Sequence, residues 1–178
     1  MSSPDPDPTS MRARASVFYP PLAWVCRDPG RLIAFGFGSG LIRPASGTWG
    51  TLLAWLIWVA AAPAASDLAI GLFLLVALVY GCWVCDRVGK ELQAADHVGM
   101  VWDEMAAFWL VLWLVPQSWT AQLAAFVLFR FFDIVKPQPI KYFDARVKGG
   151  VGVMLDDVLA AVYTLLIMVT LVRIGVLS

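Results

Sequence analysis

Charged side chains are scarce in this sequence, and their scarcity excludes several classes of protein. Asp, Glu, Lys and Arg make up 15% of the 178 residues, against about 25% in soluble domains. The formal net charge is zero, so the overall charge does not indicate a nucleic-acid partner. A secretory signal peptide is not expected either, because no apolar core follows Arg12 and Arg14.

Cysteine is also rare, and its three residues give no even disulfide framework. Cys82 and Cys85 have the CxxC spacing of some metal and redox sites, but they lie in an apolar run. No second cysteine pair or histidine pair accompanies them. We interpret both as buried small hydrophobic residues, and a metal or redox role is the alternative.

Apolar residues dominate the chain instead. They make up 60% of it, nine residues are tryptophan, and the mean hydropathy is +0.75. The length corresponds to one domain. We therefore interpret residues 15–178 as a membrane-embedded domain. Residues 1–14, which are rich in Pro, Asp and Ser, are expected to form a disordered tail.

The apolar residues fall into about five hydrophobic segments, which predict an all-α integral membrane bundle. Their order gives two hairpins and a C-terminal span, over residues 50–64 with 67–85, 105–115 with 119–132, and 158–172. Several of these segments are near or below the roughly 20 residues that cross a bilayer core. Residues 86–91 are predicted to be a solvated extension of the second helix.

Basic residues indicate how the bundle is oriented. Lys and Arg occur before the first hairpin, between the hairpins and before the last span, whereas the hairpin tips at 63–67 and 116–119 carry none. The positive-inside rule therefore predicts that the N-terminus and the polar loops at 86–104 and 133–157 lie on the cytoplasmic face. The C-terminus would lie outside.

Two pairs of adjacent acids lie in or beside these loops, Asp103 with Glu104 and Asp156 with Asp157. Four carboxylates cannot all be ionised at close range without a cation between them. Mg²⁺ prefers such oxygen ligands and is commonly held by one or two carboxylates and the phosphate oxygens of a substrate. The alternative is that each acid only caps the N-terminus of its helix, where negative charge is favourable.

A glycine-rich stretch at residues 35–51 and two cations supply parts for binding a phosphate. The five glycines, Gly47 among them, predict a loop there, and a helix from Gly50 would direct its positive end at a bound anion. A packing loop is the alternative. Lys136 and Arg146 are placed to neutralise a phosphate. A membrane enzyme that acts on a lipid phosphate needs this set of parts.

Other functions remain as alternatives or are excluded by missing motifs. A small cation transporter or channel subunit would carry acids deep within its spans, whereas these acids lie at span ends. A membrane scaffold would leave the motifs unexplained. The chain has no Cys-x5-Arg loop and no DxDx[TV] motif, and its single histidine, His97, argues against phosphatases that use two histidines.

Five separated motifs resemble those of the phosphatidylglycerophosphatase A family. They are GFGSGL at 36–41, GTWG at 47–50, VWDE at 101–104, FRFFDIVKPQPI at 129–140 and GGVGVMLDD at 149–157. The resemblance covers about residues 30–175. It implies an all-helical, Mg²⁺-dependent phosphatase of the bacterial inner membrane, which removes the terminal phosphate of phosphatidylglycerophosphate to leave phosphatidylglycerol.

The resemblance also implies roles for individual residues. The implied set is Asp103 and Glu104 as metal ligands or general base, Asp133 and Lys136 in the phosphate site, Asp156 and Asp157 as further metal ligands, Thr48 with Gly47 in the phosphate loop, and His97 as an accessory residue. Ser46 and Arg43 depart from the residues usual in the family around Pro44. Hydrolysis by water and an aspartyl-phosphate intermediate on Asp103 or Asp156 are both open.

Overall fold

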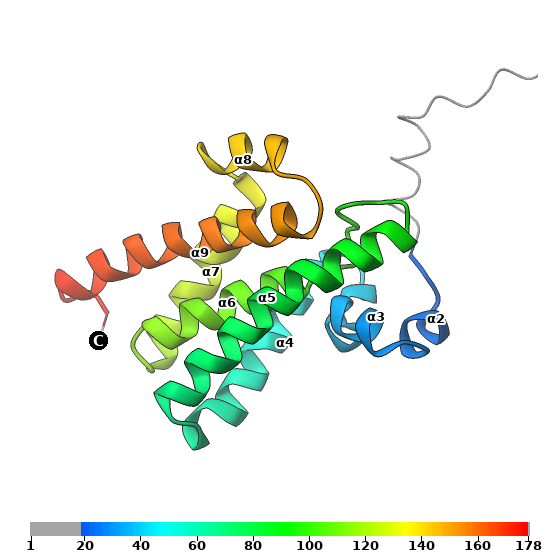
Figure 1. Ribbon diagram of the computed structural model, residues 1–178. Helices are drawn as coiled ribbons and strands as arrows, with labels where there is room; N and C mark the ends of the chain where they lie inside the picture. The colour runs from blue at the N-terminus through cyan, green and yellow to red at the C-terminus, as the bar shows by residue number, and fades with distance from the viewer. Residues whose placement is uncertain (1–18, 178) are drawn as a thin grey trace, which may run out of the picture.

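The computed structural model describes residues 19–177, and within this range the chain is helical without a β-strand (Figure 1). The elements are α2 (Leu22–Cys26), α3 (Pro29–Ala34), η1 (Gly36–Leu41), α4 (Ser46–Ala61), η2 (Ala62–Ala64), α5 (Asp67–Glu91), α6 (Trp102–Leu114), α7 (Trp119–Val135), α8 (Ile140–Arg146) and α9 (Gly150–Arg173). The predicted all-α class is confirmed. The tail predicted for residues 1–14 lies outside the described residues.

Three helical stretches are long and apolar enough to cross a membrane: residues 46–64, α5 and α9. Apolar side chains such as Leu68, Leu72 and Val76 recur along α5 with more than half of their surface exposed, as a lipid-facing helix requires. The chain is therefore a membrane protein. All five predicted segments form helices, but the predicted count of five spans is not confirmed.

Two helices, α7 with 17 residues and α6, account for this difference. Helix α6 is the shorter of the two. Its 13 residues extend about 20 Å at 1.5 Å per residue, which is less than the roughly 30 Å of a bilayer core. Nine of the 13 residues are buried, because α6 packs against α4, α5, α7 and α9 (Figure 1). Its hydrophobicity reflects burial in protein as much as contact with lipid.

Two tryptophans on α6 fix this helix to its neighbours. The indole N–H of Trp109 donates to the carbonyl oxygen of Ala54 on α4 at 2.8 Å, and that of Trp102 donates to Ala77 on α5 at 3.0 Å. A buried indole needs such a partner, since an unmet polar group in an apolar interior costs free energy. These two bonds fix the rotation of α6 and therefore the direction in which its first turn faces.

Caps and a proline set the ends of the hairpin helices. The Ser66 hydroxyl accepts from the Ala69 amide at 3.3 Å and begins α5, and the Ser118 hydroxyl accepts from the Ala121 amide at 3.4 Å and begins α7. Both replace a hydrogen bond that a helix N-terminus lacks. Pro116, which cannot continue a helix, follows the end of α6.

Two helices begin earlier than the sequence indicated. Helix α4 starts at Ser46, so the prediction of a loop as far as Gly50 is wrong. A Cβ atom on Gly50 would lie 2.7 Å from the Cβ of Val101, which shows that this glycine serves close packing. Helix α9 starts at Gly150 and not near residue 158, and a short helix, α8, forms in the predicted loop before it.

The charged end of α5 confirms the predicted solvated extension. Helix α5 continues to Glu91, and Glu91 pairs with Arg31 of α3 at 2.7 Å. Arg87 pairs with Asp28 at 2.8 Å. The hydrogen bond from Arg87, followed by that from the Arg31 amide, lowers the pKa of Asp28. These exposed pairs contribute little stability individually, but together they attach α3 to the end of α5.

The contact of α9 with α5 depends on one glycine. A Cβ atom on Gly150 would lie 1.8 Å from the carbonyl oxygen of Cys82 and 2.7 Å from the amide nitrogen of Asp86. Both are backbone atoms, so neither can move without shifting α5. Cys82 is half-buried, Cys85 is buried in the core, and both thiols are free.

We expect Gly150→Ala to destabilise the protein by about 1–3 kcal/mol through overpacking. This corresponds to about 2–4 °C of Tm per kcal/mol for a chain of this size, measured by thermal unfolding in detergent. Gly71→Ala is the matched control, because its Cβ would meet Trp113 at 3.4 Å, an ordinary contact. Equal Tm values for the two variants would contradict this account of the α5–α9 contact.

Candidate functional site

Carboxylates from three helices converge at one end of the bundle. Asp103 lies in the first turn of α6, Asp133 lies in the last turn of α7, and Asp156 with Asp157 lies in the second turn of α9. Asp103, Asp156 and Asp157 are each 4–6% exposed. Asp157 is within electrostatic reach of Asp103, Asp133 and Asp156. The structure thus brings together acids that are 54 residues apart in the sequence (157 − 103).

The capping explanation fails for one of the two pairs. Asp156 and Asp157 lie beyond the first turn of α9, which holds no acid, so they do not cap that helix. Asp103 and Glu104 do lie in the first turn of α6, where the helix dipole favours negative charge. Dipole stabilisation therefore accounts for part of the acidic cluster and not for the buried pair on α9.

Two cations lie among these acids. Nη1 of Arg130 lies 3.0 Å from Oε2 of Glu104 and 2.9 Å from Oδ2 of Asp133, and it donates to the Thr51 hydroxyl at 3.3 Å. Nζ of Lys136 contacts Oδ2 of Asp156. Arg130 is not among the site residues predicted from the sequence. The signal that could have identified it is its place inside an otherwise apolar segment, since a charged residue there is a functional candidate by default in a membrane protein.

Lys136 is held in an uncommon backbone conformation. It ends α7 with φ at +44° and ψ at +65°, and its amide donates to Phe132 at 2.8 Å. Left-handed backbone at a residue other than glycine is unusual and concentrates at functional sites. This geometry ends α7, and the lysine side chain contacts Asp156. The role of Lys136 in a phosphate site stays a prediction.

Several polar atoms of the cluster have no hydrogen-bond partner among the described residues. They include the acceptors Oδ1 of Asp103 and Oδ1 of Asp157 and the donor Nε of Arg130. Buried polar groups in native proteins are almost always satisfied, so each exception needs an explanation such as an ion or a ligand. The acceptors fit a cation, and the donor fits an anion.

Burial also disfavours the charged forms of the acids on α6, which lies outside the three membrane-spanning segments. Loss of water and the charge of Glu104 raise the pKa of Asp103 well above its usual range. Loss of water raises the pKa of Glu104 to about 8, although Arg130 opposes the shift. A cation bound at the cluster would offset this penalty and keep the carboxylates ionised.

If Mg²⁺ bound at this cluster, Asp103 and Asp157, each with a buried carboxylate oxygen that has no hydrogen-bond partner, are the residues that would hold it. Within residues 19–177, no three His, Cys, Asp or Glu side chains form a ready-made ligand set. Mg²⁺ does not need one, since it usually retains several waters and takes one or two carboxylates and the phosphate oxygens of a substrate.

The glycine-rich stretch reaches this cluster through the start of α4. Gly47 packs against the Glu104 carboxylate, and a Cβ atom there would lie 2.0 Å from Oε1 of Glu104. The Thr51 hydroxyl, which accepts from Arg130, donates to the Gly47 carbonyl at 2.9 Å. Thr48 follows on the same turn and is half-buried. The structure therefore places the predicted phosphate loop beside the acids, as the first turn of a helix.

His97 and Arg146 have other surroundings. His97 is fully buried, its Nδ1 accepts from the Gly99 amide at 3.0 Å, and its ring packs against Phe35 at 5.7 Å. The Arg146 guanidinium is exposed on α8 and lies 3.7 Å from the ring centre of Tyr142. The roles predicted for these two residues stay predictions.

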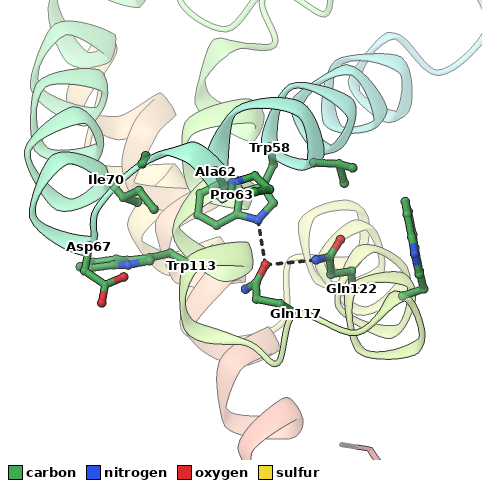
Figure 2. Close-up of a pocket in the computed structure, with 11 residues that line it drawn as sticks. Trp58, Ala62, Pro63, Asp67, Ile70, Trp113, Gln117 and Gln122 are labelled. Carbon is green, nitrogen blue, oxygen red and sulfur yellow. Dashed lines mark hydrogen bonds between the residues drawn. The ribbon is translucent and has the colours of Figure 1, made fainter.

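Two cavities show where small molecules can approach. Figure 2 shows the first, of about 430 Å³, at the hairpin tips beside Trp58 and Gln117, and none of the predicted site residues lines it. There Gln117 accepts from Trp58 at 3.1 Å and from Gln122 at 3.2 Å (Figure 2), which ties the two hairpins together.

The second cavity, of about 590 Å³, lies between the end of α5 and the start of α9. Its polar lining includes Lys90, Asp96 and Lys148. Asp96 is close enough to Asp103 for its charge to contribute to the raised pKa of that acid. Asp96 thus links the lining of this cavity electrostatically to the acidic cluster, although Asp103, Asp133, Asp156 and Asp157 do not line it.

Comparisons with known proteins match most of the chain, including the acidic cluster. The family model of phosphatidylglycerophosphatase A matches residues 32–172. Proteins named Phosphatidylglycerophosphatase A are 44% identical over 144 residues in Haemophilus influenzae, covering 79% of this chain and 86% of the relative, and 38% identical over 136 residues in Escherichia coli, covering 76% and 78%.

A further relative carries a different name. A Bacteroides thetaiotaomicron protein provisionally named as a phosphatidylinositol-3-phosphatase is 41% identical over 144 residues, covering 76% of this chain and 89% of the relative. No solved structure matches the chain.

We expect Asp157→Asn to raise the Tm of the metal-free protein, because the substitution removes one buried negative charge from a repelling cluster. In Mg²⁺ the order should reverse, since a ligand that binds only the folded state raises its stability and the variant lacks one carboxylate ligand. Thermal unfolding in chelator and in Mg²⁺ measures both effects. Asp67→Asn, at the exposed hairpin tip, is the control. A Mg²⁺ response equal to that of the unsubstituted protein would remove Asp157 from the metal site.

Proposed function

The chain belongs to the phosphatidylglycerophosphatase A family, and from this membership we propose that it hydrolyses the terminal phosphate monoester of phosphatidylglycerophosphate. The products would be phosphatidylglycerol and inorganic phosphate, which makes the protein a phosphoric monoester hydrolase. The observation that carries the proposal is the buried cluster of Asp103, Asp156 and Asp157 with Arg130 and Lys136, in a membrane-spanning bundle.

We propose that the site faces the cytoplasm at the inner membrane of a bacterium. The arginines and lysines of α3, the end of α5 and the loop before α9 lie at the end of the bundle that holds the acids. The opposite end, where the cavity of Figure 2 lies, is lined by Asp67, glutamine and tryptophan. Basic residues favour the cytoplasmic side, and tryptophans favour an interface.

The mechanism we propose is metal-assisted attack of water on the phosphorus atom. Bound Mg²⁺ would polarise a phosphoryl oxygen and lower the pKa of a water molecule. Asp103 and Asp157 would hold the ion, with Glu104 as a further ligand from the same turn. Asp156, fixed by Lys136, is placed to accept a proton from water. Lys136 would then stabilise charge on the phosphoryl group as it transfers.

Other residues of the predicted set would bind the substrate. Gly47 and Thr48 present the first turn of α4 to the phosphate, and Asp133 holds Arg130 in place. Arg146 and His97 are proposed to act on the headgroup from α8 and from the loop before α6. A covalent route, in which Asp103 or Asp156 attacks phosphorus itself, is the rival, and trapping a phosphoenzyme during turnover would establish it.

Cation transport is the less supported function. A transport path needs polar groups at successive depths along the spans. Here the buried carboxylates lie together at one end of the bundle, on α6, α7 and the second turn of α9. Such a cluster suits one bound substrate at an interface better than a path across the membrane.

The proposal is tested by phosphate release from phosphatidylglycerophosphate with the purified protein in detergent. We expect release in Mg²⁺ and none in chelator, and a loss of about 10²-fold or more for Asp103→Asn and Asp156→Asn, because each removes a group acting on the reacting atoms. Asp67→Asn is the control for charge removal. Phosphatidylinositol 3-phosphate is the competing substrate. No release from folded protein, or a preference for the inositol lipid, would contradict the proposal.

We expect Gly47→Ala to lower kcat about tenfold or more with Mg²⁺ present, because the new methyl group displaces the Glu104 carboxylate and small displacements in a site are costly. Phosphate release measures the effect, and Gly71→Ala is the control for adding a methyl group to a helix. If Gly47→Ala retained full activity, Glu104 would not need the position that the structure gives it.

A further inference from the structure

Arg130 has a donor group that the protein itself does not satisfy. Its side chain is 13% exposed, and a single nitrogen, Nη1, serves Glu104, Asp133 and Thr51. Nε is buried without a hydrogen-bond partner among residues 19–177. Arginine presents five N–H donors in a planar fork, so crowding three partners on one nitrogen leaves the Nε edge of the fork available.

The two carboxylates orient that edge. Asp133, in the last turn of α7, and Glu104, on α6, hold Nη1 from two helices, and Thr51 holds it from α4. The guanidinium therefore has little freedom to rotate. A buried charged donor without an acceptor is unfavourable, yet the surrounding contacts keep the guanidinium in this position. Arg130 is also within electrostatic reach of Asp157, so the donor belongs to the acidic cluster.

We propose that Arg130 contacts the substrate, with Nε–H donating to an oxygen of the phosphate monoester that binds among the acids. This role rests on the proposed function. The unpartnered atoms of the cluster are complementary to a metal and a phosphate bound together. Oδ1 of Asp103 and Oδ1 of Asp157, which would attract a cation, lack a hydrogen-bond donor among the described residues. Nε of Arg130, which would attract an anion, lacks an acceptor there.

The other cations are less suited to this contact. The Lys136 ammonium is already paired with Asp156, and Arg146 is exposed and stacked on Tyr142. A guanidinium also matches a phosphate geometrically, since it offers parallel donors to two oxygens, whereas an ammonium acts as a point charge. Arg130 combines the suitable group with burial and a fixed orientation.

The test measures binding of inorganic phosphate to the full-length protein in detergent and Mg²⁺, by calorimetry, beside the Tm. Arg130→Lys keeps the positive charge near Glu104 and Asp133 but has no Nε–H. We expect its phosphate Kd to rise about 10- to 100-fold, as for loss of a hydrogen bond to a charged group, with the Tm and its response to Mg²⁺ retained. Arg27→Gln, at an exposed arginine, is the control and should bind phosphate normally.

Substrate kinetics separate this role from a structural one. KM for phosphatidylglycerophosphate should rise in Arg130→Lys, and Arg130→Gln should lose more phosphate binding than Arg130→Lys. Phosphate binding unchanged in folded Arg130→Lys overturns the inference. A loss of phosphate binding together with the Mg²⁺ response also overturns it, because an arginine that only maintains the cluster would give that result.

The two proposals fail in different ways. If the unsubstituted protein releases phosphate from the lipid but Arg130→Lys binds phosphate equally well, only the role of Arg130 is lost. If the unsubstituted protein binds phosphate through Arg130 but releases none from phosphatidylglycerophosphate, the phosphate site stands and the assigned reaction is wrong.

Discussion

Burial of carboxylates at one end of an apolar bundle is the constraint on which the other features of this structure depend. Removing Asp103, Asp156 and Asp157 from water disfavours their charge, and their mutual repulsion adds to that cost. Arg130 and Lys136 offset part of it from inside the bundle. A bound cation, as proposed above, would offset the remainder. On that proposal the fold holds these groups in an unfavourable state until metal and substrate bind, as expected where function competes with stability.

Helix α6 makes this arrangement possible. It is short and surrounded by four other helices, so its first turn lies against protein on several sides while α9 presents its acids from across the bundle. The tryptophan hydrogen bonds to α4 and α5 fix its rotation. Glycine then allows the closest approaches: Gly47 admits the Glu104 carboxylate and Gly150 admits the backbone of α5. At Gly150 the contact is with backbone atoms, so the position of α9 and its acids tolerates less change than a contact between flexible side chains would allow.

The sequence predicted the helical class, the membrane location and the acids of the cluster, because long apolar runs and adjacent carboxylates are local signals. It failed where packing overrides local preference. Gly47 and Gly50 disfavour a helix by propensity, yet they lie within α4 because close neighbours require them. The α6 run indicated a span, since burial in protein and burial in lipid select the same residues. In the sequence, Arg130 was visible only as a charged residue that interrupts an apolar segment. Its partners Glu104 and Thr51 lie on other helices, and spacing along the chain does not reveal such contacts.

The unequal lengths of the helices affect the lipid around the protein. The apolar part of α5, residues 67–85, extends about 28 Å, whereas α6 extends about 20 Å and the apolar part of α7, residues 119–132, about 21 Å at the same rise. Lipid beside α7 therefore contacts a shorter hydrophobic surface than lipid beside α5. A bilayer adapts to such mismatch by thinning locally. Thinning lowers the leaflet surface beside α7, so a lipid headgroup on that side rests nearer to the depth of the acids than one beside α5.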